Sequence, residues 1–234
     1  MTLARSAWAW FVALTLAGLL TALMGLLIVP TLGWARRYVA GPALGLWGRW
    51  SARLAGIELR ITGAEKLRER KARVVLCNHS SALDMICIAA LAPSSPTAVA
   101  KAELRWLPPI NLSLWLIGTI FVERGTREQA VASLRRGAER VRREQLSLLV
   151  APEGTRARDG RLGAFKTGSF HLAKQAQAEI VPVVIVGAHA LCPPTGFLIE
   201  PGVIHIDVKD PIAPGEDPRA QAREVEELYR SWVG

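Results

Sequence analysis

The stretch Val74-Val75-Leu76-Cys77-Asn78-His79-Ser80-Ser81-Ala82-Leu83-Asp84 decides the fold. Its first four residues form a continuous apolar run, which is typical of a strand buried on both faces of a sheet. The strand is predicted to run into a helix that begins near Ser80 or Ser81. His79 is then expected at the junction, where the end of the strand meets solvent.

Around this stretch, and throughout the chain beyond Gly56, short apolar runs alternate with segments of helical periodicity. Strands are predicted at Ile57–Thr62, Val74–Cys77, Thr97–Ala100, Thr119–Val122, Ser147–Val150, Val181–Val186 and Val203–Val208. Helices are predicted at Ala82–Leu91, Arg127–Glu144, Lys166–Gln177 and Arg219–Trp232. This alternation predicts an α/β fold with a mixed, mostly buried sheet and helices on both faces. In such sheets the chemistry gathers where strands end and helices begin.

His79 and Asp84 are spaced to form a hydrogen-bonded pair. With a helix that starts near Ser80 or Ser81, Asp84 lies about one turn inside it, and its carboxylate can fold back toward the imidazole. The carboxylate would fix the ring tautomer and stabilise the imidazolium that forms when His79 takes a proton from a hydroxyl group. The spacing alone is a weak signal, because a strand-end histidine and an aspartate favoured by the helix dipole give the same pattern.

A second group of polar residues follows the predicted strand Ser147–Val150. It consists of Glu153, Gly154, Thr155 and Arg156. Arginine can bind a phosphate through two hydrogen bonds, glycine lets a backbone approach closely, and glutamate can accept hydrogen bonds from a polyol or orient the arginine. This set suits a phosphorylated glycerol.

Two further cations follow predicted strands. Arg124 ends the run Gly118 to Arg124, and beside the other groups it is predicted to be a second phosphate ligand. Lys101 directly follows Thr97–Ala100, and the sequence leaves open whether it belongs to the site or to the surface.

Four blocks of the sequence together resemble the glycerophospholipid acyltransferase family. They are Asn78-His79 with Asp84, Gly118 to Arg124, Pro152-Glu153-Gly154-Thr155-Arg156, and Val181-Pro182-Val183, in this order and spacing. The resemblance covers about residues 57–212 and is greatest to the 1-acylglycerol-3-phosphate acyltransferases, the lysophosphatidate acyltransferases. For the last block, a buried strand start with Pro182 on a sheet edge is preferred to direct contact with an acyl chain.

The resemblance implies transfer of a fatty acyl group from acyl-CoA or an acyl carrier protein thioester to the free hydroxyl of 1-acylglycerol-3-phosphate, which gives phosphatidic acid. It implies no metal, no other cofactor and no acyl-enzyme. The residue roles that it implies are His79 as general base, Asp84 as its partner, and Arg124, Glu153, Gly154, Thr155 and Arg156 as acceptor ligands, with Lys101 as a further candidate. Ala151 and Ala157 stand where family members commonly have Phe and Ser, so the packing near the acceptor is expected to differ.

The N-terminal segment is predicted to attach the chain to a membrane. Ala7 to Val29 is uncharged and apolar, and it exceeds the roughly 20 residues that cross a bilayer. It is also longer than the apolar core of a signal peptide, which is the alternative. More arginines follow the segment than precede it. This asymmetry predicts that the catalytic part lies on the cytoplasmic side of the cell inner membrane or plasma membrane.

The predicted division is therefore residues 1–56 as membrane-associated helices and residues 57–234 as the catalytic domain. Pro30, Gly33, Gly41 and Pro42 interrupt the pattern, so a single span followed by a surface helix and a shallow two-helix hairpin both fit. For the second helix, Tyr38–Leu54, ordinary packing against the catalytic domain is a further alternative.

Composition limits the possible partners. A formal net charge of +9 indicates an anionic partner, and the apolar N-terminus favours a membrane and a phosphorylated lipid over nucleic acid. Three cysteines without paired spacing give neither a disulfide framework nor a zinc site, and local sequence offers no third metal ligand beside His79 and Asp84.

Three other functions remain as alternatives. The acceptor could be glycerol-3-phosphate, a lyso-ornithine lipid or lysocardiolipin in the same type of reaction. The chain could also be a non-catalytic, membrane-bound lipid-binding protein, against which the intact His79 and Asp84 argue. A membrane esterase ranks last, because the sequence has no GxSxG elbow.

Overall fold

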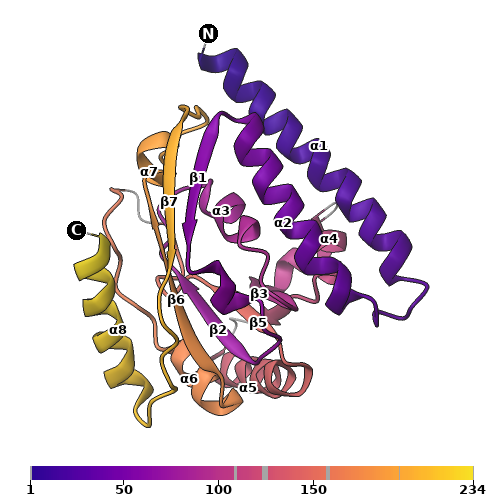
Figure 1. Cartoon of the computed structure of the whole chain (residues 1–234). Coiled ribbons are helices and arrows are strands. Elements are labelled where there is room, and N and C mark those ends of the chain that lie inside the picture. Colours follow the sequence, from indigo (N-terminus) through magenta and orange to yellow (C-terminus); the bar gives the residue numbers. More distant parts are fainter. Residues whose placement is uncertain (1, 108–109, 123–125, 157–158, 195, 234) are drawn as a thin grey trace.

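A seven-stranded sheet runs through the structure, a computed structural model that describes residues 2–107, 110–122, 126–156, 159–194 and 196–233 (Figure 1). The strands, in order across the sheet, are β1 (Ile57–Thr62), β7 (Gly202–Val208), β6 (Glu179–Val186), β2 (Arg73–Cys77), β5 (Ser147–Val150), β3 (Pro96–Lys101) and β4 (Ile120–Val122). Neighbouring strands are parallel except for β6 and β7, which are antiparallel. The predicted strands and the mixed sheet are confirmed.

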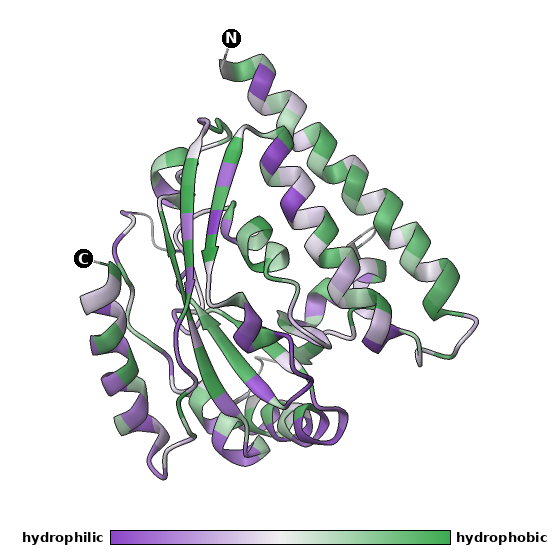
Figure 2. Cartoon of the chain, in the orientation of Figure 1, coloured by the Kyte–Doolittle hydropathy of each residue, from purple (hydrophilic) through white to green (hydrophobic). Residues whose placement is uncertain are grey.

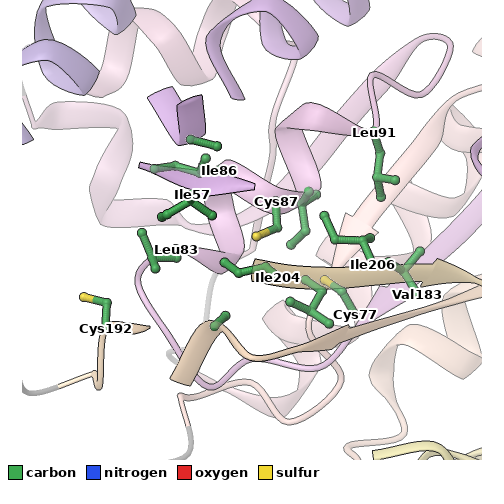
Figure 3. Packing of buried hydrophobic residues seen from close by; sticks show 14 of the residues in the cluster. Ile57, Cys77, Leu83, Ile86, Cys87, Leu91, Val183, Cys192, Ile204 and Ile206 are labelled. Carbon is green, nitrogen blue, oxygen red and sulfur yellow. The ribbon is translucent and has the colours of Figure 1, made fainter. Parts of the chain in front are cut away.

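Helices cover both faces of the sheet, as predicted (Figure 1). Alternate residues of β2 belong to two separate cores, because successive side chains of a strand point to opposite faces. Val75 and Cys77 pack in a cluster with α3 (Asp84–Ala90), part of which Figure 3 shows. Val74 and Leu76 pack on the other face. The helices of that second face are α5 (Arg127–Glu144), α6 (Gly168–Ala176) and α8 (Pro218–Val233).

Two long helices begin the chain. α1 (Thr2–Ile28) lies along α2 (Arg36–Leu54), and apolar residues cover most of its length (Figure 2). By length and composition Leu3–Ile28 could cross a membrane, with a mean hydropathy of 2.4 and only 17% of its most apolar stretch buried. Exposed side chains such as Leu14 and Leu26 would be unfavourable in water. The helix therefore supports membrane association of the protein.

Helix α2 packs tightly against α3. It continues through Gly41 and Pro42, where the sequence pattern predicts an interruption. A Cβ atom on Gly48 would lie 2.4 Å from the backbone nitrogen of Ala90 and 2.6 Å from the carbonyl oxygen of Ile86. The second helix thus packs directly on the helix that follows His79, as the packing alternative predicts.

Several elements differ from the predictions. Helix α4 (Ile110–Leu116), helix α7 (Ala188–Leu191) and the 3-10 helices η1 (Ala64–Leu67) and η2 (Ala102–Trp106) are too short to give a periodic pattern. The prediction that Pro182 lies on a sheet edge is wrong, because β6 lies between β7 and β2. Pro182 is accommodated there because the ladder of β6 with β7 begins only at the next residue, Val183.

Candidate active site

His79, in the loop between β2 and α3, forms the predicted pair with Asp84. Nδ1 of His79 lies 2.9 Å from Oδ2 of Asp84, whose side chain is fully buried. Because a carboxylate only accepts hydrogen bonds, the neutral ring donates from Nδ1 and keeps Nε2 as its proton acceptor. The imidazole is half-buried at the carboxyl end of β2 and is oriented to act as a base.

The start of α3 differs from the prediction. The helix begins at Asp84, and not near Ser80 or Ser81, so Asp84 is its first residue. Oδ2 of Asp84 accepts hydrogen bonds of 2.7 Å from the backbone N–H groups of both Ser80 and Ser81. These bonds hold the preceding residues in a turn, and the same carboxylate oxygen that orients His79 also fixes the backbone beside it.

Neighbouring side chains fix the rest of this loop. The Asn78 amide exchanges two hydrogen bonds of 2.8 Å with the backbone of Ile185, which ties the end of β2 to β6. The hydroxyl of Ser81 donates to the carbonyl oxygen of Cys192 at 2.6 Å. The loop that carries His79 is therefore held from both sides by hydrogen bonds.

Glu153 connects the next strand end to His79. β5 is the parallel neighbour of β2, so the residues after both strands meet at one edge of the sheet. One carboxylate oxygen of Glu153 accepts from the backbone N–H of His79 at 2.8 Å, and the other accepts from the N–H of Gly163 at 2.9 Å. Burial raises the pKa of Glu153, and these two hydrogen bonds act in the opposite direction. Its geometry is that of a residue that positions the loop.

The residues after Glu153 reach toward solvent. Gly154 has a φ of +72°, which glycine adopts without strain, and a Cβ there would lie 2.5 Å from Nζ of Lys166. Thr155 and Arg156 are exposed. Burial raises the pKa of the Cys192 thiol, and the positive charge of Arg156 opposes that shift. The charge of Arg156 thus acts on Cys192, whose carbonyl oxygen accepts from Ser81 in the loop of His79.

Of the two other predicted cations, Lys101 is the one that the structure describes. Lys101 ends β3, which is separated from β2 by β5, and its side chain is exposed. Arg124 lies outside the described residues. Among the described residues, no group of three or more His, Cys, Asp or Glu side chains could hold a metal ion. Burial also raises the pKa of the Cys77 thiol far above its usual range, which makes it a poor nucleophile.

Sequence reasoning missed two residues of this region. Nδ1 of His189 lies 3.1 Å from the carbonyl oxygen of Ser80, although the two residues are far apart in the sequence. Nζ of Lys166 lies close to Gly154. Lys166 belongs to the segment Gly163 to Ser169, which has the glycine spacing of a phosphate-binding loop but lacks the lysine that should follow the second glycine. Local spacing gives no signal for either residue, because both arrive through the crossing of separate elements.

A family model described as Acyltransferase matches residues 58–186 of the chain. The match runs from β1 to the end of β6, and it includes the His79 loop and the residues that follow β5.

Curated proteins with similar sequences carry a consistent name. The 1-acyl-sn-glycerol-3-phosphate acyltransferase of Saccharomyces cerevisiae is 33% identical over 162 residues, which cover 68% of this chain and 53% of that protein. The 1-acyl-sn-glycerol-3-phosphate acyltransferase alpha of Homo sapiens is 36% identical over 132 residues, which cover 56% and 47%. The chain spans about half the length of these relatives.

A solved structure has the same fold. The crystal structure of the 1-acyl-sn-glycerophosphate acyltransferase PlsC from Thermotoga maritima matches with a TM-score of 0.82 at 22% identity. The match covers 99% of this chain and 95% of the other, so the two N-terminal helices are included in the shared fold.

Proposed function

The chain belongs to the acyltransferase family, and from this premise we propose that it transfers a fatty acyl group from a thioester to the free hydroxyl of 1-acylglycerol-3-phosphate, giving phosphatidic acid. The names of its relatives support this acceptor. The observation that carries the proposal is the His79–Asp84 pair. Nε2 of His79 accepts no hydrogen bond from the part of the chain that the structure describes.

The proposed reaction uses His79 as general base. Nε2 takes the proton of the acceptor hydroxyl while the oxygen attacks the thioester carbonyl, and Asp84 stabilises the imidazolium. The carbon–sulfur bond then breaks, and the thiolate leaves with the proton that His79 has carried. Base catalysis of this kind contributes about 10²–10⁴-fold to the rate.

Electrostatic positioning of the acceptor is assigned to the predicted cations Arg156, Arg124 and Lys101. Arg156, which follows β5 and is exposed, can bind a phosphate through two hydrogen bonds. Arg124 and Lys101, together with Thr155 and the open backbone at Gly154, complete the proposed acceptor site. Glu153 holds this site together through the backbone contacts described above.

The location of the substrate fits the N-terminal helices. A lysolipid with a long acyl chain resides in the bilayer, so an enzyme attached to the membrane meets it at the interface. We assign residues 1–56 to membrane attachment and residues 57–234 to catalysis, on the cytoplasmic side of the cell inner membrane or plasma membrane. The donor is acyl-CoA or an acyl carrier protein thioester.

An acyl-transfer assay with purified protein tests the proposal. Lysophosphatidate, glycerol-3-phosphate, a lyso-ornithine lipid and lysocardiolipin are compared as acceptors, with acyl-CoA and acyl carrier protein thioesters as donors. Lysophosphatidate is expected to give the highest kcat/KM, and His79→Ala is expected to lower it by about 10²–10⁴-fold. His171→Ala, which removes an exposed imidazole from α6, is the matched control. Full activity of His79→Ala would refute the mechanism, and preference for another acceptor would refute the substrate.

A further inference from the structure

A cavity of about 170 Å³ lies at the amino-terminal ends of β3 and β5, at the sheet edge opposite His79. Its lining combines the connection between α1 and α2, the first residues of α2 and the loop before β3. We name it the arginine pocket after its lining residues Trp34, Arg36, Arg37, Arg70, Ser95 and Glu144. The cavity has room for several water-sized groups, since a water occupies about 30 Å³.

The arginine pocket carries an excess of positive charge. Glu144 supplies its carboxylate, and this group already accepts hydrogen bonds from Arg140 at 3.2 Å and Arg143 at 2.9 Å. Arg36 donates to the carbonyl oxygen of Leu116, and Arg70 donates to the carbonyl oxygen of Glu144. Among the described residues, no carboxylate forms an ion pair with Arg36, Arg37 or Arg70.

Burial and the positive charge of Arg140 lower the pKa of Arg36, and the charge of Glu144 opposes this shift only in part. Because an arginine cannot release its proton in a protein, such charge calls for an anion. Arg36 and Arg37 are half-buried and Arg70 is exposed, so a bound anion would replace only part of the water around their charge.

Two polar atoms in the pocket have no hydrogen-bond partner among the residues that the structure describes. Nε of Arg37 is buried without a hydrogen bond in the described structure, while its guanidinium lies 4.4 Å from the ring centroid of Trp34. Ser95 is 3% exposed, and its hydroxyl is likewise without a partner. A buried polar group left unsatisfied costs about 1–3 kcal/mol, so a ligand that accepts from both groups would recover this loss.

The surroundings of the pocket indicate the source of the anion. Leu32, beside the lining residues, is 98% exposed, and Trp34 is 61% exposed. Exposed Leu and Trp next to arginines are typical of a membrane interface. In addition, the residue before α2 is Ala35, whose side chain cannot cap the helix, and within the described part of the chain Thr31 accepts only from the N–H of Ala35 itself; the helix dipole favours negative charge at this end.

We propose that the arginine pocket binds the phosphate of an anionic phospholipid headgroup, as a site separate from the active site. Arg37 and Ser95 donate hydrogen bonds to the phosphate oxygens, and Arg36 and Arg70 add charge. The lipid would hold the hinge between α1 and α2 at a fixed depth in the membrane surface.

Ligand-induced thermal stabilisation of the full chain in detergent tests the site without any need for acyl transfer. The ligand is a short-chain phosphatidylglycerol, with phosphatidylcholine of the same chain length and inorganic phosphate as comparisons. The variants are Arg37→Gln and Ser95→Ala. Arg223→Gln, which removes one exposed charge from α8, is the matched control. Ser95→Ala is informative because it changes no charge.

Phosphatidylglycerol is expected to raise the Tm of the wild type and of Arg223→Gln at the same half-saturating concentration. Arg37→Gln and Ser95→Ala are each expected to need roughly tenfold more lipid, the loss that one charge-assisted hydrogen bond produces. Equal half-saturation for the wild type and both pocket variants would overturn the site. Equal stabilisation by inorganic phosphate or phosphatidylcholine would overturn an anionic lipid as its ligand.

Discussion

The carboxylate of Glu153 accepts a hydrogen bond of 2.8 Å from the backbone N–H of His79. Its other oxygen accepts from Gly163, so one buried side chain joins the residue after β2 to the segment that follows β5. His79 is thus held at its backbone by Glu153 and at its ring by Asp84. Two carboxylates with different contacts position a single imidazole.

Replacement of Glu153 by Gln tests the backbone contact. In the variant an NH₂ group must face one of two N–H donors, so His79 or Gly163 loses its acceptor. We expect a loss of about 1–3 kcal/mol in the free energy of unfolding. A fall of about 10–100-fold in kcat is also expected, because the imidazole moves from its position. Glu139→Gln, at an exposed residue of α5, is the control, and unchanged kcat and Tm in Glu153→Gln would contradict the role.

The raised pKa of Glu153 predicts a pH dependence with a defined sign. The folded state binds the Glu153 proton more tightly than the unfolded chain does. In the unfolded chain the carboxyl group has its ordinary pKa of 4.5. The contribution of this group to stability is therefore complete below pH 4.5 and is lost as the pH rises through the raised value. As the pH rises over this range, the Tm of the wild type is expected to fall relative to the Tm of Glu153→Gln. Thermal melts at a series of pH values measure this difference in Tm. A wild-type Tm that rises relative to that of Glu153→Gln would refute the raised pKa.

Asp84→Asn tests the orientation of the ring. The amide keeps the shape of the carboxylate but removes the charge that stabilises the imidazolium of His79. We expect kcat to fall by about 10²–10⁴-fold with little change in KM, because Asp84 is fully buried and out of contact with the acceptor. Steady-state kinetics with varied acceptor separate the two constants. A raised KM with an unchanged kcat would place Asp84 in acceptor binding instead.

The sequence predicts the strands and the two halves of the site well, for a physical reason. Buried parallel strands are continuous apolar runs, and the polar residues at their ends stand out against them. Val74–Cys77 and Ser147–Val150 each end in this way, so His79 and Glu153 are both predicted as site residues, and in the structure the two are in contact. Neither run shows that β2 and β5 are neighbours. This pairing of the strands brings the two residues into contact.

The parts that were not predicted depend on contacts between distant segments. The start of α3 at Asp84 follows from the hydrogen bonds of its side chain to Ser80 and Ser81, which hold those residues out of the helix. His189 reaches Ser80 from α7, a helix of one turn without a periodic pattern. Gly41 in α2 interrupts the pattern of the sequence, whereas in the structure it is a site of close packing, where a Cβ would lie 2.8 Å from the carbonyl oxygen of Pro93.

Gly48→Ala tests the packing of α2 against α3, which connects the N-terminal helices to the site. A methyl group at position 48 would lie within 2.6 Å of backbone atoms of α3, which cannot move aside as a flexible side chain could. Overpacking of this kind costs about 1–3 kcal/mol, so we expect a lower Tm. Because α3 begins at Asp84, a shift of the helix should also lower kcat. Gly18→Ala in α1 is the matched control, since a Cβ there meets nothing within 4 Å and alanine favours a helix. If both variants had the Tm and kcat of the wild type, α2 would not brace the helix that carries the partner of His79.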